Sequence, residues 1–272
     1  MKKILVPTDF SEQAEHALQT AASIAKKHNA ELYILHLLDL PVHLLSTDKN
    51  ELPEAIFFLK LAHQKFNTFL DKPYLEGLTI HELVEEDEIT TGINRVAEEN
   101  NIDIIVIGSS GASGISEIFV GSNTEKVVRH ANIPVMVIKK PILEINFKHM
   151  VYASSFLHNY HESFKKAVEM SKQFGYTLHL LYVNTPNNFK TTHAIKDRIN
   201  EFLNIAEVTD YTVNIYNDET IEEGILNFAN SINADLLSVS THGRRGLAHF
   251  FNGSLSEDLV NHAIRPVITL KI

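Results

Sequence analysis

The chain has 272 residues, 44% of them hydrophobic, so it is long enough for two ordinary domains or one large one, with a substantial core. Its net charge of −10 argues against a general binder of nucleic acids or anionic membranes. No stretch approaches the roughly 20 consecutive apolar residues of a membrane span. The chain contains no cysteine, which excludes disulfides and thiolate chemistry and fits a reducing compartment.

The first residues, MKKILVPTD, carry two lysines as an export signal does, but only about three apolar residues precede Pro7. That run is too short for the apolar region of such a signal. We therefore expect a cytoplasmic protein.

Strands and helices are predicted to alternate along the first half. A short apolar strand at 4–6 ends at Pro7-Thr8-Asp9, and Ser11 is predicted to cap the helix that follows. Further strands are expected at 31–38, 78–84, 102–107 and 134–138, helices at 12–28, 51–70, 89–99 and after Gly121-Ser122, and a loop at 41–50. Alternation of this kind with apolar strands predicts a parallel α/β layer structure.

The second half repeats the first. Ser155 lies 146 positions after Asp9 in a matching segment, whereas Gly253-Ser254 lies 132 positions after Gly121-Ser122. The difference falls between the second strand and the second helix, so the first half carries extra residues there. We expect two domains, at 1–140 and 147–272, joined by a short linker; two copies are too few for a solenoid.

A glycine-rich stretch follows the apolar run at 102–107. Gly108 and Gly111 come first, and Gly121-Ser122 then precedes a helix. Glycines let the backbone approach an anion, and free N–H groups at a helix start point toward it. A lone Gly-x-x-Gly would favour a plain tight turn. Three glycines and a serine between a strand and a helix instead favour a phosphate cradle.

The spacing Gly-x2-Gly-x9-Gly-Ser is neither the P-loop nor the dinucleotide pattern. It resembles the nucleotide-binding motif of the universal stress protein family, and the repeat resembles the tandem, two-domain members. This resemblance implies two Rossmann-like α/β domains, each with a five-stranded parallel sheet of order 3-2-1-4-5 and helices on both faces. Asp9 and Gly108 would then flank one crevice where the strand order reverses.

The resemblance also implies ATP as ligand, with Mg²⁺ held through the phosphates. Asp9 would face the ribose or, through water, the metal, although it could equally cap the following helix. Leu37 would pack against the adenine. The expected ATP-binding residues are Pro7, Thr8, Asp9, Leu37, Ile107, Gly108, Ser109, Gly111, Ala112, Gly121, Ser122 and Asn123. Family members often carry Gly-x-His-Gly here, whereas this chain has Ser109-Ser110 between its glycines. It therefore has one imidazole fewer near the expected phosphates.

The second half departs from this pattern. Asp9 becomes Ser155, Pro7 becomes Ala153, and Gly108 becomes Ser240. If the glycine position needs a positive φ, serine costs about 1 kcal/mol there, and loss of a carboxylate hydrogen bond costs about 1.5–3 kcal/mol. Together these are about two to three decades of affinity. We therefore expect a degenerate site in the second half. The charges of His242, Arg244 and Arg245 could recover part of the lost affinity. Any weak binding is expected at Val183, Gly243, Arg244, Gly253 and Ser254.

Other patterns predict no chemistry. His158 and His161 have a metal-like spacing but lack a third ligand, so a solvated polar face is expected and no metal site. No nucleophile elbow, paired-carboxylate pattern or zinc motif is present, so no catalytic residue is predicted. Two functions stay open: an ATP-binding stress-response module that is at most a very slow ATPase, or a protein-interaction module of the same fold without a nucleotide. Either needs a protein partner that the sequence does not identify.

The last strand of each half, Val135–Ile138 and Val267–Leu270, is apolar and enters through a proline. An exposed apolar edge strand promotes unwanted pairing unless it is covered. We expect these strands to pair antiparallel and form an intramolecular pseudo-dimer, as family homodimers do between chains. A homodimer of the whole chain also remains open.

Overall fold

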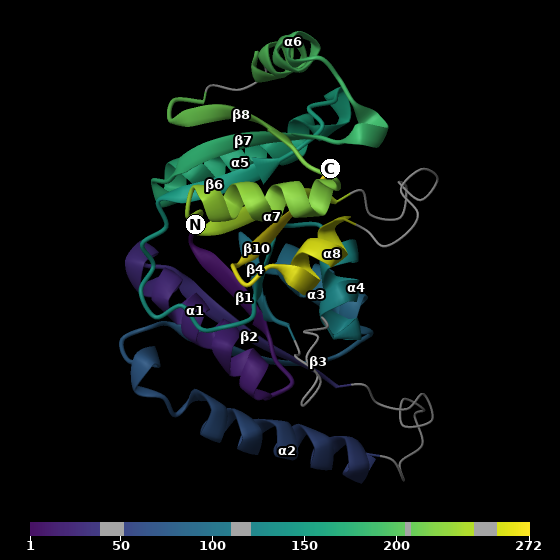
Figure 1. Ribbon diagram of the computed structural model, residues 1–272. Coiled ribbons are helices and arrows are strands. Elements are labelled where there is room, and N and C mark those ends of the chain that lie inside the picture. The colour runs from purple at the N-terminus through teal and green to yellow at the C-terminus, as the bar shows by residue number, and fades with distance from the viewer. Residues whose placement is uncertain (39–51, 110–120, 205–207, 242–254) are drawn as a thin grey trace.

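The computed structural model describes residues 1–38, 52–109, 121–204, 208–241 and 255–272 (Figure 1). Within these ranges, ten strands form one sheet of order β3-β2-β1-β4-β5-β10-β9-β6-β7-β8. Each half therefore has the order 3-2-1-4-5 with parallel neighbours, as expected. The predicted fold class is confirmed.

The first half follows the predicted alternation of strands and helices. Its elements are β1 (Lys3–Pro7), α1 (Glu12–His28), β2 (Glu31–Leu38), α2 (Leu52–Leu70), η2 (Pro73–Leu75), β3 (Ile80–Glu86), α3 (Ile89–Glu99), β4 (Ile104–Gly108), α4 (Ser122–His130) and β5 (Val135–Ile138). The elements predicted at 12–28, 31–38 and 89–99 have those bounds, and the other boundaries move by no more than two residues. The predicted loop at 41–50 lies outside the described residues.

The second half has the corresponding elements. They are β6 (His149–Ala153), η3 (His158–Tyr160), α5 (His161–Phe174), β7 (Thr177–Asn184), η4 (Pro186–Asn188), α6 (Thr192–Leu203), β8 (Tyr211–Asn217), α7 (Ile221–Ser231), β9 (Leu236–Thr241), α8 (Leu255–His262) and β10 (Val267–Lys271). Among the described helices, none is both long and apolar enough to cross a bilayer.

Helices cover both faces of the sheet, and alternate strand residues enter two separate cores. In β1, Ile4 and Val6 join the core under α1, α2, α5 and α6, whereas Leu5 joins the core under α3, α4, α7 and α8. All three side chains are fully buried. This explains why the central strands read as continuous apolar runs rather than as alternating patterns.

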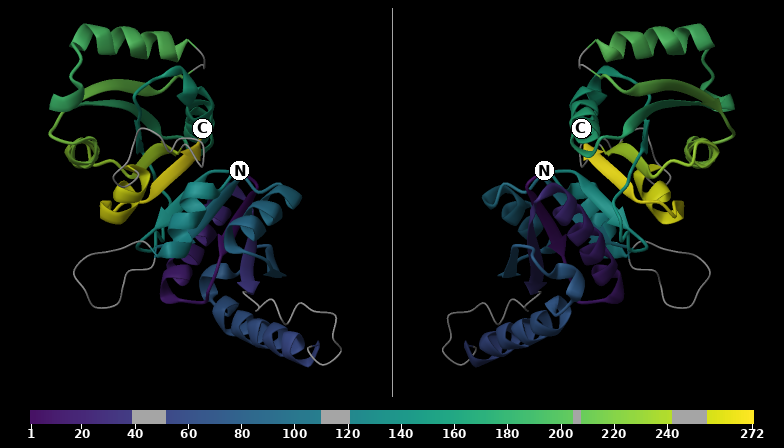
Figure 2. Two further views of the ribbon diagram at one scale, coloured as in Figure 1. Left: turned by 90° about the vertical axis from the view of Figure 1, so that its right-hand side faces the viewer. Right: turned by 90° about the vertical axis from the view of Figure 1, so that its left-hand side faces the viewer.

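The two halves share the sheet through β5 and β10, which pair antiparallel with Met136 opposite Ile268. The sequence predicted this antiparallel pairing, because both strands are apolar and would otherwise be exposed edges. The linker after β5 runs along α1, where Thr20 Oγ1 accepts from the Ile142 N–H at 3.0 Å and Ser23 Oγ donates to the Leu143 carbonyl at 3.0 Å. In Figure 2 the two halves lie next to each other and meet where β10 pairs with β5.

Candidate functional site

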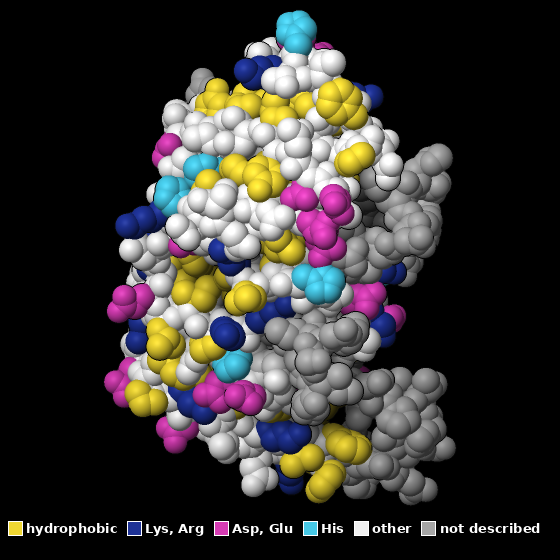
Figure 3. Space-filling model, in the orientation of Figure 1, with side chains coloured by type: hydrophobic (Ala, Val, Ile, Leu, Met, Phe, Trp, Pro, Cys, Tyr) yellow, Lys and Arg dark blue, Asp and Glu magenta, His cyan; other side chains and the backbone are white. Residues whose placement is uncertain are grey.

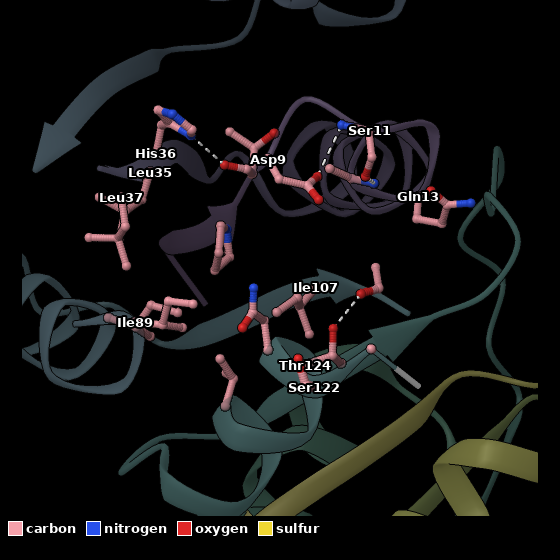
Figure 4. Close-up of a pocket in the computed structure, with 18 residues that line it drawn as sticks. Asp9, Ser11, Gln13, Leu35, His36, Leu37, Ile89, Ile107, Ser122 and Thr124 are labelled. Carbon is pink, nitrogen blue, oxygen red and sulfur yellow. Dashed lines mark hydrogen bonds between the residues drawn. The ribbon is translucent and has the colours of Figure 1, made fainter. Parts of the chain in front are cut away.

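A crevice of about 240 Å³ opens at the carboxyl ends of β1 and β4, where the strand order reverses (Figure 4). Its lining comes from β1, the start of α1, β2, α3, β4 and the start of α4. The lining residues are Pro7, Thr8, Asp9, Ser11, Gln13, Ala14, Leu35, His36, Leu37, Ile89, Ile93, Ile107, Gly108, Gly121, Ser122, Asn123, Thr124 and Val127. This is the position that ligands take in open α/β sheets.

A tight turn holds Asp9 between β1 and α1. The Phe10 N–H donates to Thr8 Oγ1 at 2.9 Å, and Phe10 itself is left-handed, with φ of 65°. The Ser11 N–H donates to Asp9 Oδ1 at 3.0 Å, and Ser11 caps α1 by accepting from the Ala14 N–H. Asp9 thus supports the turn without being the helix cap. The described residues place no donor on its second carboxylate oxygen, which can accept from a ligand.

One wall of the crevice is apolar. Leu37 packs so closely on α3 that a Cβ added at Gly92 would lie 2.8 Å from Leu37 Cδ2. Ile89, Ile93 and Ile107 complete this wall. Such a surface suits the face of a flat ring.

His36 lies beside that wall and was not predicted. Its Nδ1 is 2.8 Å from the Thr8 carbonyl oxygen, so Nδ1 carries the proton and donates. The ring packs against Phe10 with centroids 4.5 Å apart. In Figure 4, His36 lies on the side of Leu37, across the crevice from Ser122 and Thr124.

The opposite wall is the start of α4. Gly121 is the N-cap, and no side chain caps the helix. Thr124 Oγ1 donates instead to the Gly108 carbonyl at 2.8 Å, which ties α4 to the end of β4. The first-turn N–H groups have no acceptor within the helix, so they remain available to an anion in the crevice.

Gly108 is required for a different reason from the one predicted. Its φ lies outside the positive range, so a left-handed backbone does not explain it. A Cβ there would lie 2.1 Å from the Gln13 carbonyl oxygen, and 3.2 Å from the Ala14 nitrogen. The glycine therefore allows the first turn of α1 to lie against β4, which brings the Asp9 turn close to the α4 start.

Most predicted residues meet in the crevice: Pro7, Thr8, Asp9, Leu37, Ile107, Gly108, Gly121, Ser122 and Asn123. Ser109 does not, because it is buried and its N–H donates to the Ile138 carbonyl at 2.9 Å. Gly111 and Ala112 lie outside the described residues. The residues that the sequence reasoning missed are Ser11, Gln13, Ala14, Leu35, His36, Ile89, Ile93, Thr124 and Val127. The apolar face predicted for α3 and the first turns of α1 and α4 could have pointed to most of these residues. Leu35 and His36 lie on β2 and belong to no such pattern.

The described lining carries little charge. Asp9 is its one carboxylate, and neither lysine nor arginine belongs to it. Across the described residues, no group of three potential metal ligands occurs. Phosphate charge would therefore be met by backbone N–H groups, hydroxyls and a cation brought by the ligand.

In the second half, a cluster of hydroxyl groups lies under the position equivalent to the end of β4. Tyr152, Ser163 and Ser240 replace Val6, Ala17 and Gly108 of the first half. The Tyr152 hydroxyl lies 3.1 Å from Ser163 Oγ and 3.3 Å from Ser240 Oγ, and the two serine oxygens lie 2.8 Å apart. Burial raises the pKa of Tyr152, so this cluster is neutral.

Helix α5 begins later than its counterpart α1. The position equivalent to the first residue of α1 is His158, but α5 begins at His161, and residues 158–160 form the 3-10 helix η3. Val183 packs on Gly224 as Leu37 packs on Gly92. The other residues expected at a second site, Gly243, Arg244, Gly253 and Ser254, lie outside the described residues, as do His242 and Arg245.

His158 and His161 lie together, with ring centroids 4.2 Å apart. Desolvation and the neighbouring His158 lower the pKa of His161. No third ligand joins them among the described residues.

Comparisons with known proteins agree with this geometry. The model of the universal stress protein family matches residues 1–139 and again 146–271. Universal stress protein MJ0531 of Methanocaldococcus jannaschii is 32% identical over 151 residues, covering 52% of this chain and 83% of that protein. Universal stress protein MJ0577 of the same organism is 32% identical over 155 residues, covering 51% and 95%. The crystal structure of a universal stress protein from Archaeoglobus fulgidus covers 99% of this chain and 98% of that one, at 23% identity and a TM-score of 0.71.

Proposed function

The chain belongs to the universal stress protein family, and we propose that the crevice of its first half binds one ATP molecule together with Mg²⁺. The observation that carries the proposal is one crevice with an apolar wall, a carboxylate and an open helix start. Adenine would lie against Leu37 and Ile93. The ribose would lie at Asp9, and the phosphates would lie at Gly121, Ser122 and the first turn of α4.

Mg²⁺ fits this donor set through the phosphates. The described lining offers a single carboxylate, too few for a site made by protein alone, and Mg²⁺ ordinarily keeps several waters beside phosphate oxygens. Asp9 would accept from one of those waters or from a ribose hydroxyl. The cation also offsets phosphate charge in a crevice without lysine or arginine.

We propose that nucleotide exchange changes how this protein meets a partner in a cytoplasmic stress response, and that turnover is slow. Hydrolysis needs a group that takes a proton from water at the γ-phosphate. His36 lies on the wall opposite the α4 start, and Asp9 is held by the turn before α1. We expect a turnover well below the ~10 s⁻¹ typical of enzymes. Steady-state phosphate release above about 1 s⁻¹ that Ser122→Ala abolishes would make the protein an ATPase.

The same observations favour one nucleotide per chain. In the second half, Ser240 stands where Gly108 lines the crevice, and its hydroxyl bonds to Tyr152 and Ser163. Ser155 also replaces Asp9, so the carboxylate is missing. We therefore propose at most a weak second site at Val183 and the 243–254 segment.

Calorimetry on protein stripped of ligand tests the proposal. ATP with Mg²⁺ should bind with a stoichiometry near one, and Asp9→Ser, which installs the residue of the second half, should weaken binding by at least about tenfold. The matched control is Ser155→Ala, which should leave affinity unchanged. No binding up to millimolar ATP would instead favour the interaction module, an alternative supported by the absence of lysine and arginine from the described lining and by Ser109-Ser110.

A glycine pair gives a second comparison. Gly121→Val should cost far more affinity than Gly253→Val, because Gly121 is the N-cap of the open helix in the intact crevice. Equal losses from the two variants would contradict binding in the first half alone.

A further inference from the structure

The two ends of the ten-stranded sheet are the edge strands β3 and β8. Both are seven residues long and occupy equivalent places in their halves. An edge strand exposes unpaired N–H and C=O groups and pairs with another chain unless charges or covering elements prevent it. The two edges differ in this respect.

The hydrogen bonds to the neighbouring strand show which residues face the open edge. The Leu178 N–H of β7 donates to the Asp210 carbonyl at 3.0 Å, and the Asp218 N–H donates to the Asn184 carbonyl at 3.2 Å. Even-numbered residues around β8 therefore bond inward to β7. The odd-numbered residues Tyr211, Val213, Ile215 and Asn217 turn their backbone groups outward.

In β3 the corresponding outward residues are Ile80, Glu82, Val84 and Glu86, because the Leu32 N–H of β2 donates to the Thr79 carbonyl at 2.9 Å. Glu82 and Glu86 are exposed and protect this edge by charge.

Position by position, β8 replaces those two glutamates by Val213 and Asn217. Its sequence, YTVNIYN, carries no charge. Tyr211 and Val213 are 40% and 39% exposed, so α6 covers these two residues only in part. Figure 1 shows β8 as the last strand at its end of the sheet.

We propose that two copies of this chain associate through β8, pairing antiparallel about a twofold axis at Val213. Tyr211 would then lie opposite Ile215 of the second copy, and Val213 opposite Val213. Aromatic and β-branched cross-strand pairs of this kind stabilise sheets. Three hydrogen-bonded pairs would contribute about six backbone hydrogen bonds, and the sheet would continue from one chain into the next.

A second copy fits this edge because the edge is complementary to itself. The chain carries a net charge of −10, so copies repel one another over most surfaces. An uncharged strand avoids that repulsion, and a twofold contact requires only one surface. The β3 edge cannot do the same, because its glutamates would face glutamates.

The association is tested on the full chain by sedimentation equilibrium over a range of concentrations. A dimer is expected, and Val213→Glu should raise its dissociation constant by about 100-fold or more, since two like charges would then face each other. Glu82→Gln at the other edge is the matched control and should leave the dimer unchanged. Val213→Glu should fold, because β3 already carries Glu82 at that position, and circular dichroism checks this.

A cross-linking test fixes the register. The chain lacks cysteine, so Val213→Cys introduces a single thiol. Facing Cα atoms in a hydrogen-bonded antiparallel pair lie about 5.5 Å apart, within disulfide reach. Val213→Cys should give a covalent dimer under mild oxidation, whereas Glu82→Cys should not. A chain that stays monomeric, including one whose β8 binds an extended peptide of another protein, overturns the proposal. A dimer that Val213→Glu leaves intact also overturns it.

Discussion

Replacing Gly108 by alanine should damage both the fold and the crevice, because the added methyl group meets backbone rather than a flexible side chain. The new Cβ would lie 2.1 Å from the Gln13 carbonyl oxygen and 2.5 Å from its carbon. Ordinary contacts of this kind begin near ~3.4 Å, so the first turn of α1 must retreat by roughly 1 Å. Overpacking of this type costs about 1–3 kcal/mol.

Two assays measure this effect. Thermal unfolding should shift downward by about 2–4 °C for each kcal/mol lost. Because Ser11 and the Asp9 turn move with α1, ATP affinity should fall by about tenfold or more in the same variant. Loss of affinity with unchanged stability would place the methyl group in the crevice instead of against α1.

The second half offers a matched control, since Ser240 occupies the equivalent position there. Ser240→Ala keeps the Cβ and removes a hydroxyl that touches Tyr152 and Ser163. It should cost about 1 kcal/mol and leave ATP affinity unchanged. If Gly108→Ala is as stable and binds as tightly as the unmodified chain, the close approach of α1 to β4 does not constrain the site.

The remaining predictions concern the shared sheet and two basic side chains, the buried His179 and the partly buried Lys139. Met136→Pro should lower the unfolding temperature of both halves together, because Met136 pairs with β4 on one side and with Ile268 on the other; two separate transitions in the unmodified protein would contradict one sheet. Burial and the neighbouring His149 lower the pKa of His179, so the unfolded chain binds more protons than the folded one near pH 6. The free energy of unfolding, measured with urea, should therefore decrease as pH falls through about 6.5. His179→Gln should make this dependence on pH weaker. Burial lowers the pKa of Lys139 to about 8, so stability should rise between about pH 8 and 10.5, and Lys139→Met should remove the rise.

The elements could be read from the sequence because their patterns are local. Apolar runs mark the buried strands, and Ser11 caps α1 as its side chain predicts. The strand order came from the resemblance alone, since no local pattern specifies which strands become neighbours. The reason for Gly108 also could not be predicted, because Gln13 is distant in sequence and meets it only in the fold.

The same limit applies to the crevice. The Thr124 hydroxyl donates to the Gly108 carbonyl, a contact across 16 positions that no local pattern predicts. Ser109 lies within the glycine motif, but its N–H donates to the Ile138 carbonyl of β5 and not to the crevice. His36 belongs to no motif, and contacts with the Thr8 carbonyl and the Phe10 ring hold it beside the apolar wall.

The departures of the second half from the first occur in spatial groups rather than singly. A serine at position 240 is possible only because α5 begins later than α1, and its hydroxyl then has partners only because Ser163 and Tyr152 replace alanine and valine. Reverting one member alone would leave a buried hydroxyl short of a partner or a void in the core. Restoring the arrangement of the first half around the end of β9 therefore requires changes at several positions at once, which is why a single added carboxylate at Ser155 should not create a second ATP site.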